Sequence, residues 1–292
     1  MINYWVHTIT PLHVGSGRGL GYIDLPIARE KVTNWPYIPG SSVKGVIADY
    51  YNAGEDSRKN DVMLKAAFGL SDGDDYSDKG GSAAGALVFT DAHILCMPVR
   101  SFYGTFAWIT SPFCLQRLAR SWNLNAENIN IKDRGALLPE GSKLCADNKI
   151  YLEDLDLKAE VKSEASAIAE KIAKAVFADD ESWQKIFTER FAVIDDDTFT
   201  FLCEAGTEVN ARIRIDSETG ITKDGALWYE EALPVESILT GNIWCDRVYV
   251  KDITQQDLIS KFCNKTLNLQ IGGHASTGKG QARFIFAGEQ HE

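Results

Sequence analysis

The sequence lacks several features that would assign it to a common class of protein. None of its six cysteines forms a CxxC pair and no histidine stands at zinc-ligand spacing from them, so we predict buried free thiols and no structural zinc. No apolar run reaches the roughly 18 residues of a membrane span. The N-terminal MINYWVHTIT is too polar for a signal peptide. These absences predict a cytoplasmic protein with no membrane partner.

An excess of basic charge is also missing. The chain has 30 Lys and Arg against 41 Asp and Glu, and its net charge of −11 argues by itself against nucleic acid. The acid is unevenly spread, because residues 151–200 hold 13 acidic and 6 basic residues whereas residues 1–50 hold 3 acidic and 4 basic ones. Since binding depends on the local field, a basic groove on an acidic body stays open.

Two glycine-rich segments fail as nucleotide-binding motifs. Segment 13–21 has Leu20 where the dinucleotide fingerprint needs glycine, and segment 273–280 has Gly280 where a P-loop needs Ser or Thr. We therefore expect neither a Rossmann fold nor ATPase activity. Glycine-rich backbone can still approach a phosphate closely. Segment 13–21 is thus either a flexible turn or a phosphate-binding loop, and the second segment with Lys279 fits an RNA backbone.

Strand and helix patterns alternate irregularly along the chain, without the long repeating units of a doubly wound sheet. This order favours an α+β fold with a mainly antiparallel sheet. An extended stretch is expected at 22–29, with Pro26 at an edge or bend. Strands are expected at 3–9, 86–95, 103–110, 266–273 and 282–287, and helices after a Ser41 or Ser42 N-cap, at 111–122 after a Ser111 N-cap, at 155–177 and at 252–264.

Three segments depart from this core pattern. The polar, glycine-rich segment 71–85 predicts a mobile loop, and the acidic segment near 155–190 predicts a helical insertion. Segment 207–231 predicts a long hairpin that turns near Glu218–Gly220. We expect the whole chain, 1–292, to form one domain around them.

Asp24 is the most informative candidate for chemistry. It is a lone carboxylate among apolar neighbours, between a glycine-rich turn and the segment IPGSSVKG (38–45). There Ser41, Ser42 and Lys44 mark a helix start, whose free N–H groups and dipole attract phosphate. A lone Asp is usually a surface residue, and a helix start is often an ordinary cap, so both alternatives stay open on these residues alone.

Two further segments carry candidate acid–base groups. WYEEALP (228–234) supplies Tyr229 beside Glu230 and Glu231, and His13 stands within the first glycine-rich segment. The alternatives are a solvated hairpin edge and a structural histidine. No Ser-His-Asp or Cys-His arrangement follows from the spacing, so covalent catalysis finds no support.

The segment LHVGSGRGLGYIDLPIAREKVTNWPYIPGSSVKGVI (12–47) resembles the N-terminal signature of the RAMP superfamily of CRISPR proteins. The runs at 98–113, 227–234 and 271–284 are similar to the repeated backbone subunit of type III-B effector complexes, and they follow the family's order. The resemblance implies a ferredoxin-like antiparallel sheet core of the RNA-recognition-motif type, with inserted helical segments and an extended β-hairpin.

The same resemblance implies a role in antiviral defence. Such a subunit binds a CRISPR guide RNA, forms a filament with further copies of itself and joins other subunits of the complex. It is an endoribonuclease that cuts complementary, single-stranded target RNA with a divalent metal, Mg²⁺ or Mn²⁺. One alternative is a non-catalytic scaffold that only binds RNA. Another is an endonuclease that trims guide precursors, as other superfamily members do.

The resemblance also implies roles for single residues. Asp24 matches the family's catalytic aspartate and would hold the metal, while His13, Tyr229 and Glu230 lie in matching segments as weaker catalytic candidates. Because an aspartate of ordinary pKa, about 3.9, is a poor base near neutrality, we expect it to bind metal or orient the RNA 2′-hydroxyl. The residues implied for RNA binding are Gly15, Ser16, Gly17, Arg18, Gly40, Ser41, Ser42, Lys44, Gly273 and Lys279.

Overall fold

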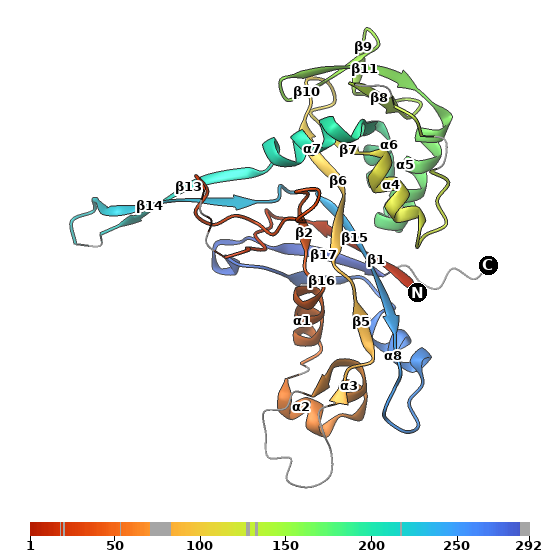
Figure 1. Ribbon diagram of the computed structural model, residues 1–292, viewed down its shortest axis with the longest axis vertical. Helices are drawn as coiled ribbons and strands as arrows, with labels where there is room; N and C mark the ends of the chain where they lie inside the picture. The colour runs from red at the N-terminus through yellow and green to blue at the C-terminus, as the bar shows by residue number, and fades with distance from the viewer. Residues whose placement is uncertain are drawn as a thin grey trace.

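The computed structural model describes residues 1–17, 19, 21–52, 54–70, 83–126, 129–131, 134–216 and 218–286. Arg18 and residues 71–82 of the expected mobile loop lie outside the described residues. Figure 1 shows a central sheet, a lobe of strands and helices at one end of it, a smaller group of helices at the other end, and a hairpin that projects sideways.

The main sheet contains β1 (Ile2–Thr8), β2 (Tyr37–Ile38), β5 (Leu87–Phe89), β6 (Ala92–Arg100), β7 (Phe106–Thr110), β8 (Gly135–Leu138), β9 (Cys145–Ala146), β10 (Lys149–Leu152), β11 (Leu155–Val161), β12 (Phe191–Ile194), β15 (Ile238–Cys245), β16 (Leu267–Gln270) and β17 (Gln281–Phe286). Its order is β16-β17-β1-β15-β6-β7-β12-β8-β11-β10-β9, with β2 beside β6 and β5 beside β15. Two neighbouring pairs, β7–β12 and β8–β11, are parallel. The sheet is therefore mixed, and mainly antiparallel as predicted.

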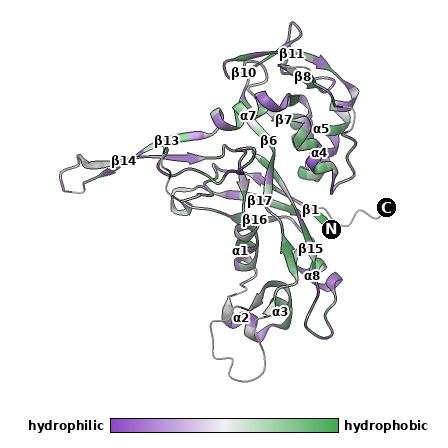
Figure 2. Cartoon of the chain, viewed as in Figure 1, coloured by the Kyte–Doolittle hydropathy of each residue, from purple (hydrophilic) through white to green (hydrophobic). Residues whose placement is uncertain are grey.

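The helices cover this sheet in two groups. They are α1 (Gly40–Tyr50), α2 (Glu55–Asn60), α3 (Val62–Phe68), α4 (Pro112–Ala119), α5 (Ser163–Val176), α6 (Glu181–Arg190), α7 (Asp196–Ala205) and α8 (Gln255–Phe262). α1 contacts β5 and β16, and α8 contacts β15, whereas α5 and α6 pack on the strands of the upper lobe. Figure 2 shows the central strands β1 and β15 as largely hydrophobic, and all seven residues of β1 are buried.

The helix starts test two of the capping predictions. Ser111 accepts a hydrogen bond from the Cys114 N–H at 3.3 Å and Pro112 opens α4, so that prediction is confirmed. The prediction that Ser41 or Ser42 caps α1 is wrong. The helix begins at Gly40 after Pro39, and it has no side-chain cap. Proline fixes φ near the helical value, so the chain enters the helix before either serine.

The prediction of a helix from residue 155 is also wrong at its start. Residues 155–161 form β11, in which Leu157 and Ala159 are buried between exposed polar neighbours. That alternation has the period of a strand, and helical spacing begins only with α5 at Ser163. The helical part of the expected insertion is α5 and α6.

A hairpin occupies the segment where one was expected. β13 (Glu208–Ile215) and β14 (Thr222–Ala232) pair antiparallel from Glu208 opposite Ala232 to Ile215 opposite Thr222. Gly220, in the connecting turn, has φ +68°, which glycine adopts without strain. Figure 1 shows that the two strands extend well beyond the body, which they join at the beginning of β13 and the end of β14.

The cysteines are packing residues. Cys96, Cys114, Cys203 and Cys263 are buried, and burial raises the pKa of the Cys114 and Cys263 thiols to about 12. Such thiols are unreactive near neutrality. Among the described residues, no helix is long and apolar enough to cross a membrane.

Candidate nucleic-acid interface and active site

Four segments that are distant in the sequence meet where the hairpin joins the body. Leu25 pairs with the hairpin strand β14, donating its N–H to Tyr229 O at 3.0 Å and accepting from the Glu231 N–H at 3.0 Å. The second glycine-rich loop joins the first, because the Gly273 N–H donates to His13 O at 2.8 Å. We call this junction the hairpin base. It brings together Asp24, His13, Tyr229, Glu230, Gly273 and Lys279, which the sequence analysis listed as catalytic or RNA-binding candidates and whose roles stay predictions.

Asp24 lies exposed at the edge of the hairpin base. Its Oδ2 accepts a hydrogen bond from the Tyr229 N–H at 2.8 Å, and its carbonyl oxygen accepts from the Gly19 N–H at 2.9 Å. Its other carboxylate oxygen accepts no hydrogen bond from the described residues. The carboxylate is thus held in place through one oxygen, and the second oxygen of this exposed residue is left to accept from a ligand.

His13 is buried, and its surroundings fix its tautomer. Nδ1 lies 2.6 Å from the carbonyl oxygen of Glu231, and a carbonyl only accepts, so Nδ1 carries the proton. In the neutral ring Nε2 then holds a lone pair, and it faces Gly15. A Cβ on Gly15 would lie 2.8 Å from Nε2, so the close approach of this loop requires glycine.

Glu230 is the charged centre of the hairpin base. Its carboxylate is buried and accepts from Trp228 Nε1 at 2.9 Å and from Arg212 Nε at 3.0 Å. Burial alone would raise the pKa of Glu230, but these hydrogen bonds and the nearby positive charges lower it below its usual range. Glu230 is therefore an anion that organises its neighbours, whereas the Tyr229 side chain is 39% exposed.

Lys279 is buried, and its predicted contact with RNA stays a prediction. Its side chain is 7% exposed and its Nζ lies 3.6 Å from Glu230 Oε2. The ammonium has no hydrogen-bond partner among the described residues. Attraction to the buried Glu230 carboxylate explains why this cation turns inward.

Sequence reasoning named Glu231 only as the neighbour of Glu230, without a role in the site, and it did not single out His274. Glu231 is buried and accepts from the Ile27 N–H at 3.0 Å, from Arg29 Nη2 at 2.5 Å and from Thr207 Oγ1 at 2.9 Å, so it clamps the hairpin to the body. His274 lies with its ring 4.9 Å from that of His13 and its Nε2 3.7 Å from Glu230 Oε1. Its position inside the second glycine-rich segment was the signal that could have drawn attention to it.

The start of α1 has already engaged its strongest anion-binding groups. The Gly40 N–H donates to Asp91 Oδ1 at 2.7 Å, and Lys44 Nζ donates to Leu87 O at 2.9 Å. Burial, and then the charge of Arg58, lower the pKa of Lys44. Ser41 is exposed and Ser42 half-buried. RNA contact by these residues stays a prediction, with the serines better placed than Lys44.

The first glycine-rich loop is partly tied down as well. The Ser16 N–H donates to Pro26 O at 3.1 Å, while Gly17 has φ +99° and no atom within 4 Å of an added Cβ. Contact of Gly15, Ser16, Gly17 and Gly273 with RNA also stays a prediction, and Arg18 lies outside the described residues.

A divalent metal would find only part of its ligands here. In the described part of the chain, no group of three or more His, Cys, Asp or Glu side chains could hold a metal ion. Asp24 offers one carboxylate oxygen that accepts no hydrogen bond from the described residues, so phosphate oxygens and water would have to complete the coordination of a hard cation.

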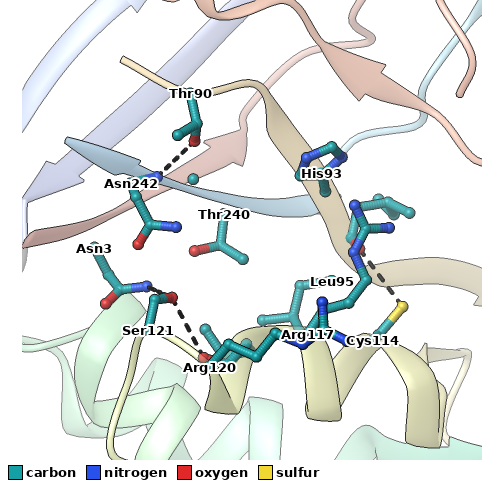
Figure 3. Close-up of a pocket in the computed structure, with 13 residues that line it drawn as sticks. Asn3, Thr90, His93, Leu95, Cys114, Arg117, Arg120, Ser121, Thr240 and Asn242 are labelled. Atoms are coloured by element: carbon teal, nitrogen blue, oxygen red, sulfur yellow. Dashed lines mark hydrogen bonds between the residues drawn. The ribbon is translucent and has the colours of Figure 1, made fainter. Parts of the chain in front are cut away.

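A cavity of about 240 Å³ lies elsewhere, between α4 and strands β1, β6 and β15 (Figure 3). His93 and Arg117 line it, but both already bond Glu30, with Arg117 Nη1 at 2.9 Å. Asn3 Nδ2 donates to Ser121 Oγ at 3.0 Å. The described residues that line this cavity include none of those predicted for RNA contact, so we place the functional site at the hairpin base.

Comparison with known proteins shows the family to which the chain belongs. The family model of the RAMP superfamily matches residues 5–283, and the chain belongs to that superfamily. The CRISPR system Cmr endoribonuclease Cmr4 of Pyrococcus furiosus is 35% identical over 286 residues, which cover 94% of this chain and 92% of the relative. The resemblance found in the sequence is therefore confirmed.

Solved structures show the same fold. A crystal structure of oligomeric Cmr4 from Pyrococcus furiosus has a TM-score of 0.72 at 29% identity, covering 98% of this chain and 97% of that one. A cryo-EM structure of the type III-B Cmr-beta complex bound to cognate target RNA includes a chain that matches with a TM-score of 0.71 at 18% identity, covering 98% and 96%. At that identity the likeness concerns the fold alone.

Proposed function

We propose that this chain is the guide-RNA-binding backbone subunit of a type III-B CRISPR effector complex. We propose further that it cuts complementary target RNA, with Asp24 as a catalytic residue. The observation that carries the proposal is the hydrogen bond from the Tyr229 N–H to Asp24 Oδ2, 2.8 Å long. It holds an exposed carboxylate at the hairpin base. The part of β13 and β14 that projects beyond this base, which we call the arm, is free to enter an RNA duplex. Similarity to a Cmr endoribonuclease along 94% of this chain supports the same activity.

The subunit works within an assembly. Its partners are the guide RNA, the target RNA, further copies of itself in a filament and the other subunits of the complex. The oligomeric form of the Pyrococcus relative supports self-association. The cytoplasm stays its predicted compartment, and one domain over 1–292 stays its predicted organisation.

The RNA-recognition-motif type of core, with a ferredoxin-like βαββαβ order, also belongs to this proposal. The order of elements β1-α1-β6-β15-α8-β17 supports it, because the four strands lie in the order β17-β1-β15-β6 with every neighbouring pair antiparallel. In such a core the hairpin and the upper lobe are insertions between β6 and β15.

The geometry of the arm suggests how a cut is limited to one position. Ile213, Ile215, Ile221 and Leu227 are each more than half exposed on the arm. An apolar wedge of this kind can unstack a base pair of the guide–target duplex. A splayed nucleotide reaches the in-line geometry, with 2′-hydroxyl, phosphorus and leaving oxygen aligned, that A-form RNA denies it. Alignment can supply up to roughly 7–11 kcal/mol of the barrier.

A divalent metal, Mg²⁺ or Mn²⁺, belongs to the proposal as a cofactor that Asp24 would help to hold. When bound, it would neutralise charge at the scissile phosphate. The chain's own task is to fix the Asp24 carboxylate and the RNA backbone relative to each other.

The test uses the reconstituted complex with a guide-matched RNA. Wild type should cut at regular intervals in the presence of a divalent metal, and Asp24→Asn should lower the rate at least about 100-fold without weakening target binding. Asp179→Asn, an exposed aspartate between α5 and α6, is the matched control. Cutting at the wild-type rate by Asp24→Asn would overturn the catalytic assignment and favour the non-catalytic, RNA-binding scaffold. Cleavage of repeat RNA by the isolated chain would favour guide processing instead.

A further inference from the structure

The hairpin base holds two imidazoles, and they differ in accessibility. His13 is 6% exposed, with Nδ1 bonded to Glu231 O and Nε2 against Gly15. His274 is 27% exposed on the second glycine-rich loop. Its ring packs edge-on to the His13 ring at 4.9 Å and an interplanar angle of 62°. Of the two, only His274 can reach a bound RNA without a rearrangement of the site.

The loop holds His274 in a fixed place. Its carbonyl oxygen accepts from the Thr277 N–H at 3.0 Å, from Thr277 Oγ1 at 2.9 Å and from the Lys279 N–H at 3.3 Å. Its φ of +65° lies in the left-handed region, which few non-glycine residues adopt, although histidine does so more often than most. Such conformations gather at functional sites, and here the strained residue is the one that presents an imidazole to solvent.

The charges around His274 keep its ring available as a proton acceptor. Burial lowers the pKa of His274, as do His13, Lys279 and Arg212, whereas Glu230 raises it. The net shift is below the ordinary value of 6.5. His274 is therefore mainly neutral at pH 7, when the exposed carboxylate of an ordinary aspartate is too weak a base for a hydroxyl.

We propose that His274 accepts the proton of the 2′-hydroxyl of the target RNA, with His13 as a positioning residue behind it. The inference rests on the proposed function, because it names the base of the same reaction. The 2′-O–H bond breaks and its proton passes to an imidazole nitrogen of His274. The 2′-oxygen bonds to phosphorus as the bond from phosphorus to the 5′-oxygen breaks. The leaving 5′-oxygen takes a proton from water, which gives a 2′,3′-cyclic phosphate and a 5′-hydroxyl.

The decisive experiment is a pH–rate profile of single-turnover cleavage by the reconstituted complex. We use His274→Asn, because asparagine tolerates the left-handed conformation, and His274→Gln as a second variant of similar length. We expect both to cut about 10²–10⁴-fold more slowly at pH 7. In wild type the rate should rise with pH up to the pKa of His274, below 6.5, and this acid limb should vanish in both variants. Target binding should be unchanged.

His93→Gln is the matched control, since His93 has a similar side-chain exposure, 34%, and lies on β6 outside the hairpin base. It should cut with the rate and the profile of wild type. His274 variants that cut at the wild-type rate would overturn this inference alone. So would slower variants that keep the wild-type acid limb, because that result belongs to a merely structural residue. A wild-type complex that does not cut would overturn the proposed function as well.

A second substrate distinguishes whether His274 acts as a general base or as a general acid. In RNA with a sulfur in place of the bridging 5′-oxygen at the cleavage site, the leaving thiolate needs no proton. If His274 is the base, the variants stay slower than wild type on this substrate by the same factor. Recovery of the wild-type rate would show that His274 protonates the leaving group, and would overturn the assignment.

Discussion

The two ends of one hairpin follow opposite rules. At the hairpin base, Glu230 and Glu231 are both 2% exposed, and each carboxylate is bonded by several donors. Along the arm, Ile213 is 52% and Ile221 68% exposed, with no cover from the body. Buried polar groups persist only when they are satisfied, and clustered exposed apolar groups mark a surface that meets a partner. The contacts of the hairpin base are therefore satisfied within this chain, whereas the arm offers an apolar surface to a partner molecule.

This difference also explains how the arm can stand alone. An isolated two-stranded hairpin is marginally stable in water. Here the ends of β13 and β14 are fixed by Glu231, which bonds Thr207 at 2.9 Å and the Ile27 N–H at 3.0 Å. The same clamp orients the Tyr229 N–H toward Asp24. Anchoring the arm and holding the candidate catalytic carboxylate are thus one structural task.

The largest effect on stability should come from a substitution that breaks the contacts of the hairpin base. Glu231→Ala deprives the Arg29 guanidinium of its only carboxylate among the described residues and leaves the Ile27 N–H without its acceptor, which should cost about 3–5 kcal/mol and lower Tm by roughly 5–10 °C. Calorimetry on the isolated chain measures it. Glu160→Ala removes an exposed carboxylate paired with Lys162 at 3.2 Å and should change stability by less than about 1 kcal/mol. Equal shifts of Tm in the two variants would show that Glu231 does not hold the hairpin to the body.

An intermediate effect, on cleavage and not on stability, should come from the arm. Ile213→Ser removes an apolar contact with an unstacked base, and we expect cutting roughly 10-fold slower, which corresponds to about 1.4 kcal/mol. Tm should change little, because the side chain is exposed. Val161→Ser, on the 54% exposed Val161 of β11, is the control and should cut normally. A large fall in Tm for Ile213→Ser would mean that the arm packs on the body.

The smallest effect should come from the first glycine-rich loop. An added methyl in Gly15→Ala meets His13 Nε2 at 2.8 Å, so the ring or the loop must shift, at a cost of about 1–3 kcal/mol. Cleavage should fall several-fold with Tm slightly lower. Gly21→Ala, where nothing lies within 4 Å, should leave both measurements unchanged. Identical behaviour of the two variants would remove His13 from the reaction.

Local patterns predicted the parts of this fold that depend on near neighbours. The Ser111–Pro112 helix start and the β13–β14 pairing both follow from turn and cap chemistry that acts over a few residues. The errors arose where a distant group competed. Asp91, 51 residues away, takes the Gly40 N–H, and the parallel partner β8 makes a strand of residues 155–161.

The sequence by itself determined that a lone aspartate lies between the glycine-rich segment 13–21 and the segment IPGSSVKG (38–45), in the order of the RAMP superfamily. It therefore indicated Asp24 and the neighbourhood of His13 and Glu230. Only the tertiary structure decided that Lys279 turns inward, that Glu231 is a clamp and that His274 is the accessible imidazole. Those outcomes depend on burial and on contacts between residues that lie from 44 to 204 positions apart in the sequence, which no local spacing encodes.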